Sequence, residues 1–174
     1  TNGAYRIKHT GAKQEKIIDE PIRSIVKLSE NELIFVGQKA IYKYLRDTKK
    51  IVELEKVTEY IHRCYLDSQN ILWMMLWNNG IEGINLKTLK KYKIDIDTVD
   101  YNNNIVFSMY RDNASSLWLG MFGNGLIEVK NPISDKTEII NHSESRMYLS
   151  DGSNVILDIH GDKTGNLWLG TNGG

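Results

Sequence analysis

The chain has 174 residues, of which 41% are hydrophobic, so it is long enough to form a domain with a buried core. Its 22 lysines and arginines balance its 22 aspartates and glutamates, which argues against binding to nucleic acid or to an anionic membrane surface. No apolar run approaches the ~18 residues that a membrane span needs, and the single cysteine, Cys64, excludes an internal disulfide.

The first segment, "TNGA" at 1–4, reads like the last segment, "TNGG" at 171–174. Because a natural C-terminus rarely falls within a turn between two strands, we interpret the chain as an excerpt of a longer repeating architecture. Residues 1–18 then supply two strands whose preceding partners are missing. Residues 154–174 supply two strands whose following partners are missing.

One pattern occurs four times along the chain. Each copy has an alternating apolar stretch, a turn, a short strand with a large anchor residue, a break rich in Gly or Asn, and a further apolar run. The anchors are Phe35, Trp73, Trp118 and Trp168. Six residues before the three tryptophans stand Asp67, Asp112 and Asp162, and Ser29 takes this place in the first copy. Repeats of about 40–50 residues indicate a solenoid or propeller.

Each copy is predicted to contain four strands. In the second copy they cover about 60–66, 71–76, 81–86 and 89–95, and the turns contain Asp, Asn and Gly. Segment 47–61 is also compatible with a helix, but its alternation and the repeat context favour a strand. The second strand of each copy is expected at 33–37, 71–76, 116–121 and 166–170. Short strands at this spacing predict an all-β fold, a fragment of a β-propeller built from four-stranded antiparallel blades.

The predicted organisation is a single partial propeller domain over residues 1–174, with about four blade equivalents. The ranges expected are a half blade at 1–20, full blades at 21–58, 59–101 and 102–153, and a half blade at 154–174. The two half blades could meet within one chain, pair with another copy or remain open. We expect a homodimer, because unpaired strand edges and uncovered apolar faces promote association.

The last copy, "DKTGNLWLGTNGG" (162–174), resembles the two-component regulator propeller repeat. The third copy keeps most of the motif but has Ser115 and Ser116 in place of Gly-Asn. The second copy has Met75 where the family has Gly. The resemblance covers essentially the whole chain at the level of repeats.

This resemblance implies a sensor module rather than a catalyst. Propellers of the family form the periplasmic part of hybrid two-component histidine kinases, anchored in the inner membrane and abundant in Bacteroides-type bacteria. There they recognise fragments of polysaccharides. The implied ligand is therefore an oligosaccharide, and the implied location is the periplasm. Neither a kinase nucleotide loop nor a membrane contact is expected within this segment.

The repeated tryptophans and aspartates favour structural roles. A tryptophan in the middle of a strand, flanked by leucine, is expected to pack between blades. Asp67, Asp112 and Asp162 are expected to cap their own turns and to lie far apart in a ring. No metal motif, nucleophile motif or helix-linked phosphate loop occurs, so we expect no catalytic residue, metal or cofactor.

One set of residues goes beyond the scaffold. Four residues after the anchors, in the turn after the second strand, the copies diverge to Lys39, Trp77, Phe122 and Asn172. Aromatic rings and amides suit the apolar faces and hydroxyls of a sugar. The candidate ligand-binding residues are Trp77, Asn78, Asn79, Phe122, Asn124 and Asn172. Alternatively, both rings fold back onto neighbouring blades.

Two further functions stay open at this point. Streptogramin lyases have a similar fold but need a complete ring with a central metal-bound site, and this chain has no His–Glu pair at matched positions. A propeller that serves only protein–protein contacts is the second alternative.

Overall fold

The structure is a computed structural model, and it describes residues 3–7, 14–77, 80–96, 105–142 and 155–172. These residues contain sixteen β-strands and no helix, which confirms the all-β prediction. The strands are β1 (Ala4–Ile7), β2 (Gln14–Ile18), β3 (Ile22–Lys27), β4 (Glu32–Gly37), β5 (Ala40–Leu45), β6 (Lys50–Lys56), β7 (Ile61–Leu66), β8 (Ile71–Leu76), β9 (Ile81–Asn85), β10 (Lys91–Ile94), β11 (Val106–Arg111), β12 (Leu117–Met121), β13 (Leu126–Lys130), β14 (Glu138–Asn141), β15 (Ile156–Gly161) and β16 (Leu167–Thr171). No helix in the described residues is long and apolar enough to cross a membrane.

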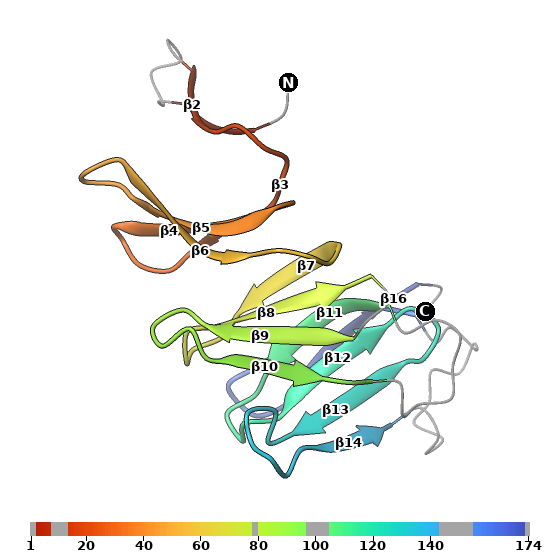
Figure 1. The fold of residues 1–174 in the computed structure, drawn as a ribbon. Helices are drawn as coiled ribbons and strands as arrows, with labels where there is room; N and C mark the ends of the chain where they lie inside the picture. The colour runs from red at the N-terminus through yellow and green to blue at the C-terminus, as the bar shows by residue number, and fades with distance from the viewer. Residues whose placement is uncertain (1–2, 8–13, 78–79, 97–104, 143–154, 173–174) are drawn as a thin grey trace. The chain divides into compact units, whose positions relative to one another are not determined.

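The strands form three four-stranded sheets and two two-stranded sheets (Figure 1). The four-stranded sheets have the orders β3-β4-β5-β6, β7-β8-β9-β10 and β11-β12-β13-β14, so neighbours in sequence are neighbours in space. β1 pairs with β2, and β15 pairs with β16. Short turns between consecutive strands impose this antiparallel order. The expected second strands coincide with β4, β8, β12 and β16, and the ambiguous segment 47–61 contains the strand β6.

The chain divides into two compact units, Thr1–Cys64 and Tyr65–Gly174. In the first unit, Ala4 and Ile18 from the β1–β2 sheet pack with Phe35 and Tyr44 from the β3–β6 sheet. The Phe35 and Tyr44 rings meet edge to face with centroids 6.0 Å apart. Packing between successive sheets therefore holds this unit together.

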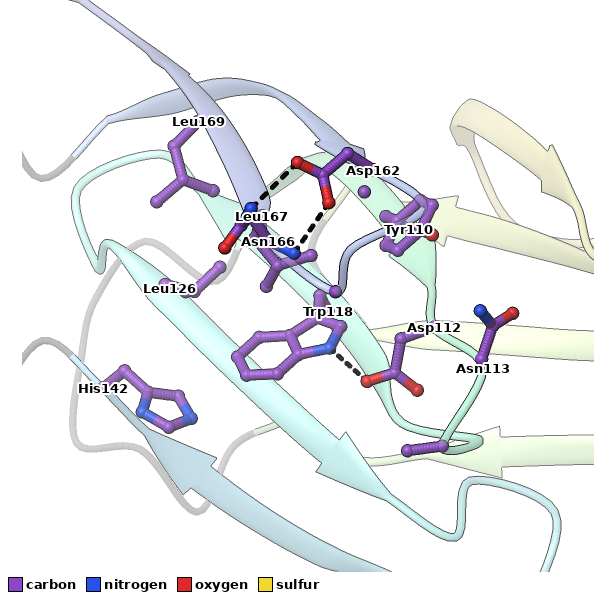
Figure 2. A pocket seen from close by; sticks show the side chains of 13 residues that line it. Tyr110, Asp112, Asn113, Trp118, Leu126, His142, Asp162, Asn166, Leu167 and Leu169 are labelled. Carbon is purple, nitrogen blue, oxygen red and sulfur yellow. Dashed lines mark hydrogen bonds between the residues drawn. The ribbon is translucent and has the colours of Figure 1, made fainter.

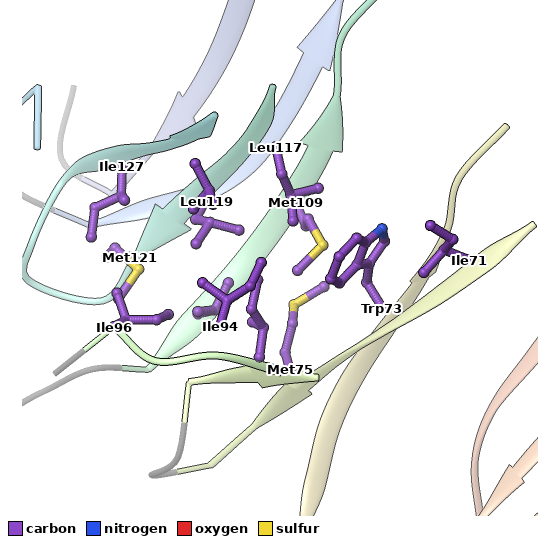
Figure 3. Packing of buried hydrophobic residues seen from close by; sticks show 13 residues of the cluster. Ile71, Trp73, Met75, Ile94, Ile96, Met109, Leu117, Leu119, Met121 and Ile127 are labelled. Carbon is purple, nitrogen blue, oxygen red and sulfur yellow. The ribbon is translucent and has the colours of Figure 1, made fainter. Parts of the chain in front are cut away.

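The second unit contains the largest core cluster, which lies between the β7–β10 and β11–β14 sheets (Figure 3). Trp73 and Met75 from β8 meet Met109 from β11 and Leu117 and Leu119 from β12. All five side chains are buried, and each buried side chain of this size stabilises the fold by about 1.5–3 kcal/mol. A smaller cluster of Leu126, Ile156 and Ile159 joins the β11–β14 sheet to the β15–β16 sheet, with Trp118, Leu167 and Leu169 packed against it.

The structure corrects the alignment of the first repeat by one residue. The amide of Leu28 bonds to the carbonyl of Glu32, as that of Asp112 bonds to Ser116. Leu28 is therefore the counterpart of Asp112, and Ile34, six residues after Leu28, is the counterpart of Trp118. Phe35 and Ser29 therefore do not occupy the tryptophan and aspartate positions, and Phe35 packs toward Ala4 and Ile18.

The turn after β4 confirms this correction. The amide of Gln38 bonds to the carbonyl of Pro21, as the amide of Phe122 bonds to that of Ile105. Gln38, rather than Lys39, is therefore the counterpart of Phe122. The "ELIFVG" run of β4 is apolar on both faces, so its alternation alone does not specify which residue faces which sheet.

Candidate functional site

The turns that precede β8, β12 and β16 share one hydrogen-bonding unit. In each turn the Oδ1 atom of an aspartate accepts a hydrogen bond from the backbone amide four residues later. The N–Oδ1 distances are 2.9 Å for Ile71–Asp67, 2.8 Å for Ser116–Asp112 and 2.9 Å for Asn166–Asp162. This confirms the prediction that each aspartate caps its own turn.

The second carboxylate oxygen of each aspartate accepts a bond from the indole of the following tryptophan. The Nε1–Oδ2 distances are 3.0 Å for Trp73–Asp67, 2.8 Å for Trp118–Asp112 and 3.0 Å for Trp168–Asp162. The aspartate therefore fixes both the turn and the indole edge, a link that the spacing of six residues did not reveal. Trp73 is fully buried and Trp118 is half-buried, as packing between blades predicts, whereas Trp168 is 63% exposed.

Asp67 carries a further partner from the next sheet. The guanidinium of Arg111, the last residue of β11, donates from Nη1 to Asp67 Oδ2 at 2.6 Å. The two side chains are only 4% and 0% exposed, so this is a buried ion pair. The amide of Arg111 also donates to the Tyr65 hydroxyl at 3.3 Å. A tyrosine and an aspartate of one sheet thus bind one arginine of the next, and the Trp73 indole donates to the same aspartate oxygen.

The following pair of sheets repeats this arrangement without the arginine. Tyr110, Asp112 and Trp118 correspond to Tyr65, Asp67 and Trp73, and Gly161 stands where Arg111 stands, directly before the aspartate of its own turn. A Cβ on Gly161 would lie 2.2 Å from the Tyr110 ring, so Tyr110 occupies the space of a side chain there.

A pocket of about 680 Å³ lies at this second junction (Figure 2). Trp118 and Leu126 line it from the β11–β14 sheet, and Leu167 and Leu169 line it from β16. Its polar side chains come from both turns and from the end of β14: Asp112, Asn113, Asp162, Asn166 and His142. Asp112 and Asp162, from neighbouring sheets, therefore both line this pocket, whereas Asp67 does not.

His142 is held in place on one side of this pocket. Its Nε2 lies 3.1 Å from Glu128 Oε2, and its ring lies 5.2 Å from that of Trp118. Glu128 is buried and also accepts a bond from the Ser116 hydroxyl at 2.7 Å. The hydrogen bonds from Ser116 through Glu128 to His142 therefore hold the imidazole ring beside the Trp118 indole.

Asp162 is the most extensively hydrogen-bonded of the three aspartates. It accepts bonds from the amide and hydroxyl of Thr164, from the amide and side chain of Asn166 and from the Trp168 indole. These bonds, those of Thr164 first, hold the pKa of Asp162 well below the ordinary aspartate value. Asp162 is therefore an anion at neutral pH.

The residues predicted from the divergent turns lie elsewhere. Trp77 follows β8 and Phe122 follows β12, in turns closed by the equivalent bonds Leu76 to Gly80 and Met121 to Gly125. The side chains are 43% and 40% exposed. The Phe122 ring stacks on Phe107, with centroids 5.5 Å apart, so part of the ring folds back onto its own sheet.

The predicted amides are distributed unequally. Asn172 is exposed, whereas Asn124 is only 6% exposed and lies within its turn. Asn78 and Asn79 fall outside the described residues. Sequence reasoning missed the stacking partner Phe107, which stands at the register shift between Val106 and Ser108. It also missed Arg111, and the signal available was a cation directly before the capping aspartate.

No group of three potential metal ligands occurs among the residues that the structure describes. None of the curated proteins compared with the sequence matches it. A family model described as "Two component regulator propeller" matches residues 150–173. That range contains the "GNLWLG" motif on which the resemblance of the last repeat depends, so the match supports the resemblance at this repeat.

Solved structures show the same fold over nearly the whole chain. The extracellular domain of the putative one component system BT4673 from B. thetaiotaomicron aligns with 98% of this chain, at 18% identity and a TM-score of 0.68. That of the putative hybrid two component system BT3049 aligns with 97%, at 20% identity and a TM-score of 0.66. PorZ of Porphyromonas gingivalis, a surface component of the type-IX secretion system, aligns with 99%, at 16% identity and a TM-score of 0.70.

The chain spans 24%, 23% and 29% of the lengths of these three structures. At these identities the likeness concerns the fold. The chain is thus a fragment of a β-propeller, and its three four-stranded sheets are blades.

Proposed function

We propose that the chain is the ligand-sensing propeller module of an extracytoplasmic, periplasmic sensor in a hybrid two-component system with a histidine kinase. The match at residues 150–173 and the fold shared with extracellular domains of such systems support this class. In this role the chain binds and does not catalyse, and the kinase activity belongs to other segments of the sensor.

The proposed ligand is an oligosaccharide derived from a polysaccharide. The observation that carries this part is the pair of exposed aromatic side chains, Trp77 and Phe122, at the same position of turns in adjacent blades. An aromatic ring offers a flat apolar face to the C–H face of a sugar. Stacking on Phe107 orients the Phe122 ring, and the exposed amide of Asn172 stands at the equivalent position of the β15–β16 sheet.

Isothermal titration of an oligosaccharide panel tests this proposal. One member should bind, and Trp77→Ala or Phe122→Ala should weaken that binding about five- to twelvefold, the loss expected for one aromatic contact of roughly 1–1.5 kcal/mol. Trp168→Ala is the matched control, because this ring is also exposed but lies in a strand rather than in the turn. Equal losses of binding affinity in all three variants would contradict a ligand site in these turns. Formation of a product from any glycan would contradict the role of a sensor that does not catalyse.

A further inference from the structure

Arg23 stands where the regular pairing of the first strand of its sheet is interrupted. The register between β3 and β4 shifts at this residue, and such an irregularity turns the side chain that it contains in a new direction. In β11 the same shift occurs at Phe107, the ring that stacks on Phe122. Arg23 is therefore the counterpart, in the β3–β6 sheet, of a residue that supports the proposed oligosaccharide site.

The Arg23 side chain is exposed, and an aromatic ring orients its guanidinium. The Cζ atom lies 4.4 Å from the centroid of the Tyr60 ring, which is a cation–π contact. Tyr60 stands in the chain between β6 and β7, so the contact involves no residue of the β1–β2 and β15–β16 sheets, which have only two strands. The contact therefore does not depend on strands that those two sheets lack.

The contact with Tyr60 leaves the N–H groups of Arg23 available. A guanidinium has five N–H donors in its plane, and stacking on a ring uses its face rather than these edges. Among the residues that the structure describes, no carboxylate forms an ion pair with Arg23, in contrast to Arg111. The buried carboxylate of Glu20 accepts a hydrogen bond from the amide of Lys39 instead.

The turn beside Arg23 is polar where its counterpart in the β11–β14 sheet is aromatic. Gln38 and Lys39 lie in the turn after β4, at the same end of the sheet as Arg23, because β3 begins where β4 ends. Both side chains are exposed, and Gln38 is the counterpart of Phe122. Two cations and an amide at one end of a sheet suit a ligand that carries both a negative charge and hydroxyl groups.

We propose that Arg23, oriented by Tyr60, binds the carboxylate of an acidic saccharide, which is a uronic acid unit. The planar fork of a guanidinium matches the two oxygens of a carboxylate, and Lys39 adds positive charge. This inference rests on the proposed recognition of an oligosaccharide, and it names the class of sugar that this end of the β3–β6 sheet recognises.

The test is isothermal titration of the whole chain with trimers of galacturonate, glucuronate, mannuronate and guluronate. Each is compared with the neutral trimer in which the carboxyl groups are reduced to alcohols. At least one acidic trimer should bind at least about tenfold more tightly than its neutral counterpart, because hydrogen bonds between charged groups are the strong ones.

The outcomes separate this inference from the proposed function. Equal binding of the acidic and neutral members of every pair, weakened by Trp77→Ala, would overturn the inference and leave the proposed function standing. No binding of any trimer would also overturn the inference, and the wider oligosaccharide panel then tests the proposed ligand by itself.

An arginine at the other end of the same sheet provides a matched control. Arg23→Gln should weaken binding of the acidic trimer at least about tenfold and leave binding of the neutral trimer unchanged. Arg46→Gln should change neither, because Arg46 is also exposed but lies in the turn after β5, where β4 begins. Since Arg23 is exposed, the thermal midpoint of Arg23→Gln should equal that of the wild type. Wild-type affinity of Arg23→Gln for the acidic trimer would exclude Arg23.

Two further variants test how Arg23 binds. Arg23→Lys keeps the charge but loses the fork, so its affinity for the acidic trimer should fall between those of Arg23→Gln and the wild type. Tyr60→Leu should weaken binding about two- to fivefold, the loss expected for one exposed cation–π contact. Wild-type affinity in Arg23→Lys would overturn recognition by the guanidinium fork, and wild-type affinity in Tyr60→Leu would overturn the positioning role of the ring.

Discussion

At the scale of single residues, the three tryptophans occupy the same position in sequence but differ in exposure. Trp73 is 0% exposed, Trp118 is half-buried and Trp168 is 63% exposed, although all three donate to an aspartate. The hydrogen bond is therefore a local property of the turn, while burial depends on what lies against the sheet.

This difference predicts a graded series in the free energy of unfolding. Trp73→Ala should cost about 3–5 kcal/mol, as large-to-small changes in a core do, and Trp118→Ala should cost less. Trp168→Ala should cost the least, about 1 kcal/mol for its hydrogen bond. Urea denaturation measures the series. A larger loss of unfolding free energy for Trp168→Ala than for Trp73→Ala would show that the hydrogen bond in the turn contributes more to stability than packing of the ring does.

Cys64 provides a second prediction at this scale. Burial raises the pKa of its thiol to about 12, so almost no thiolate exists at pH 8 in the folded chain. We expect a thiol reagent such as DTNB to react at least about tenfold more slowly with the native chain than with the chain in urea. As the only cysteine, Cys64 gives an unambiguous signal.

The same shift has a defined sign for stability. An unfolded thiol ionises near a pKa of about 8.5, below the folded value. The stabilising contribution of Cys64 is therefore complete below about pH 8.5 and is lost as the pH rises toward 12. A Cys64→Ser variant should lack this loss, and an equal alkaline loss in that variant would exclude the thiol as its source.

At the scale of elements, the turn before each of β8, β12 and β16 needs one residue in the left-handed conformation. Asn70, Ser115 and Gly165 have φ angles of 62°, 72° and 90° at this position. The variation from Gly to Asn and Ser, which weakens the sequence motif, therefore leaves the geometry of the turn intact.

Because serine is strained at such an angle, Ser115→Gly should stabilise the chain by up to about 1 kcal/mol. Gly165→Ala should destabilise it by about the same amount. No atom lies within 4 Å of a Cβ at Gly165, so that effect comes from the backbone alone. Thermal unfolding measures the midpoint temperature of both variants. A change of the same sign in the two midpoints would contradict this explanation.

At the scale of the whole molecule, two of the five sheets have only two strands. Within the described residues, β1 pairs only with β2 and β16 only with β15. β1–β2 corresponds to the third and fourth strands of a blade, and β15–β16 to the first and second. We propose that the two kinds of sheet pair between two copies of the chain, because exposed strand edges template association.

The expected result is a dimer in light scattering at micromolar concentration. Trp168→Lys should shift the mass toward one chain, since it places a charge on the exposed face of β16. Leu89→Lys is the control, because Leu89 is 45% exposed in the turn between β9 and β10. A wild-type mass of one chain that does not change on concentrating would exclude the exchange.

The sequence by itself determined the strand order and the capped turns, because both depend on contacts between residues close in the chain. The alternation of "NIVFSMY" and the Asp, Asn and Gly of the turns were sufficient to predict β11 and its neighbours. The position of Phe35 was wrong by one residue, because β4 is apolar on both faces and the choice between them is made by packing.

Only the tertiary structure decided which side chains meet between sheets. Asp67 and Arg111 are 44 residues apart in the chain, and their ion pair forms because two separate sheets pack face to face. For the same reason Asp112 and Asp162 line one pocket, although their repeats read alike in sequence. Gly161 stands at the position of Arg111 in the next repeat without any change in the strand pattern, yet it has no side chain that could pair with Asp112 as Arg111 pairs with Asp67.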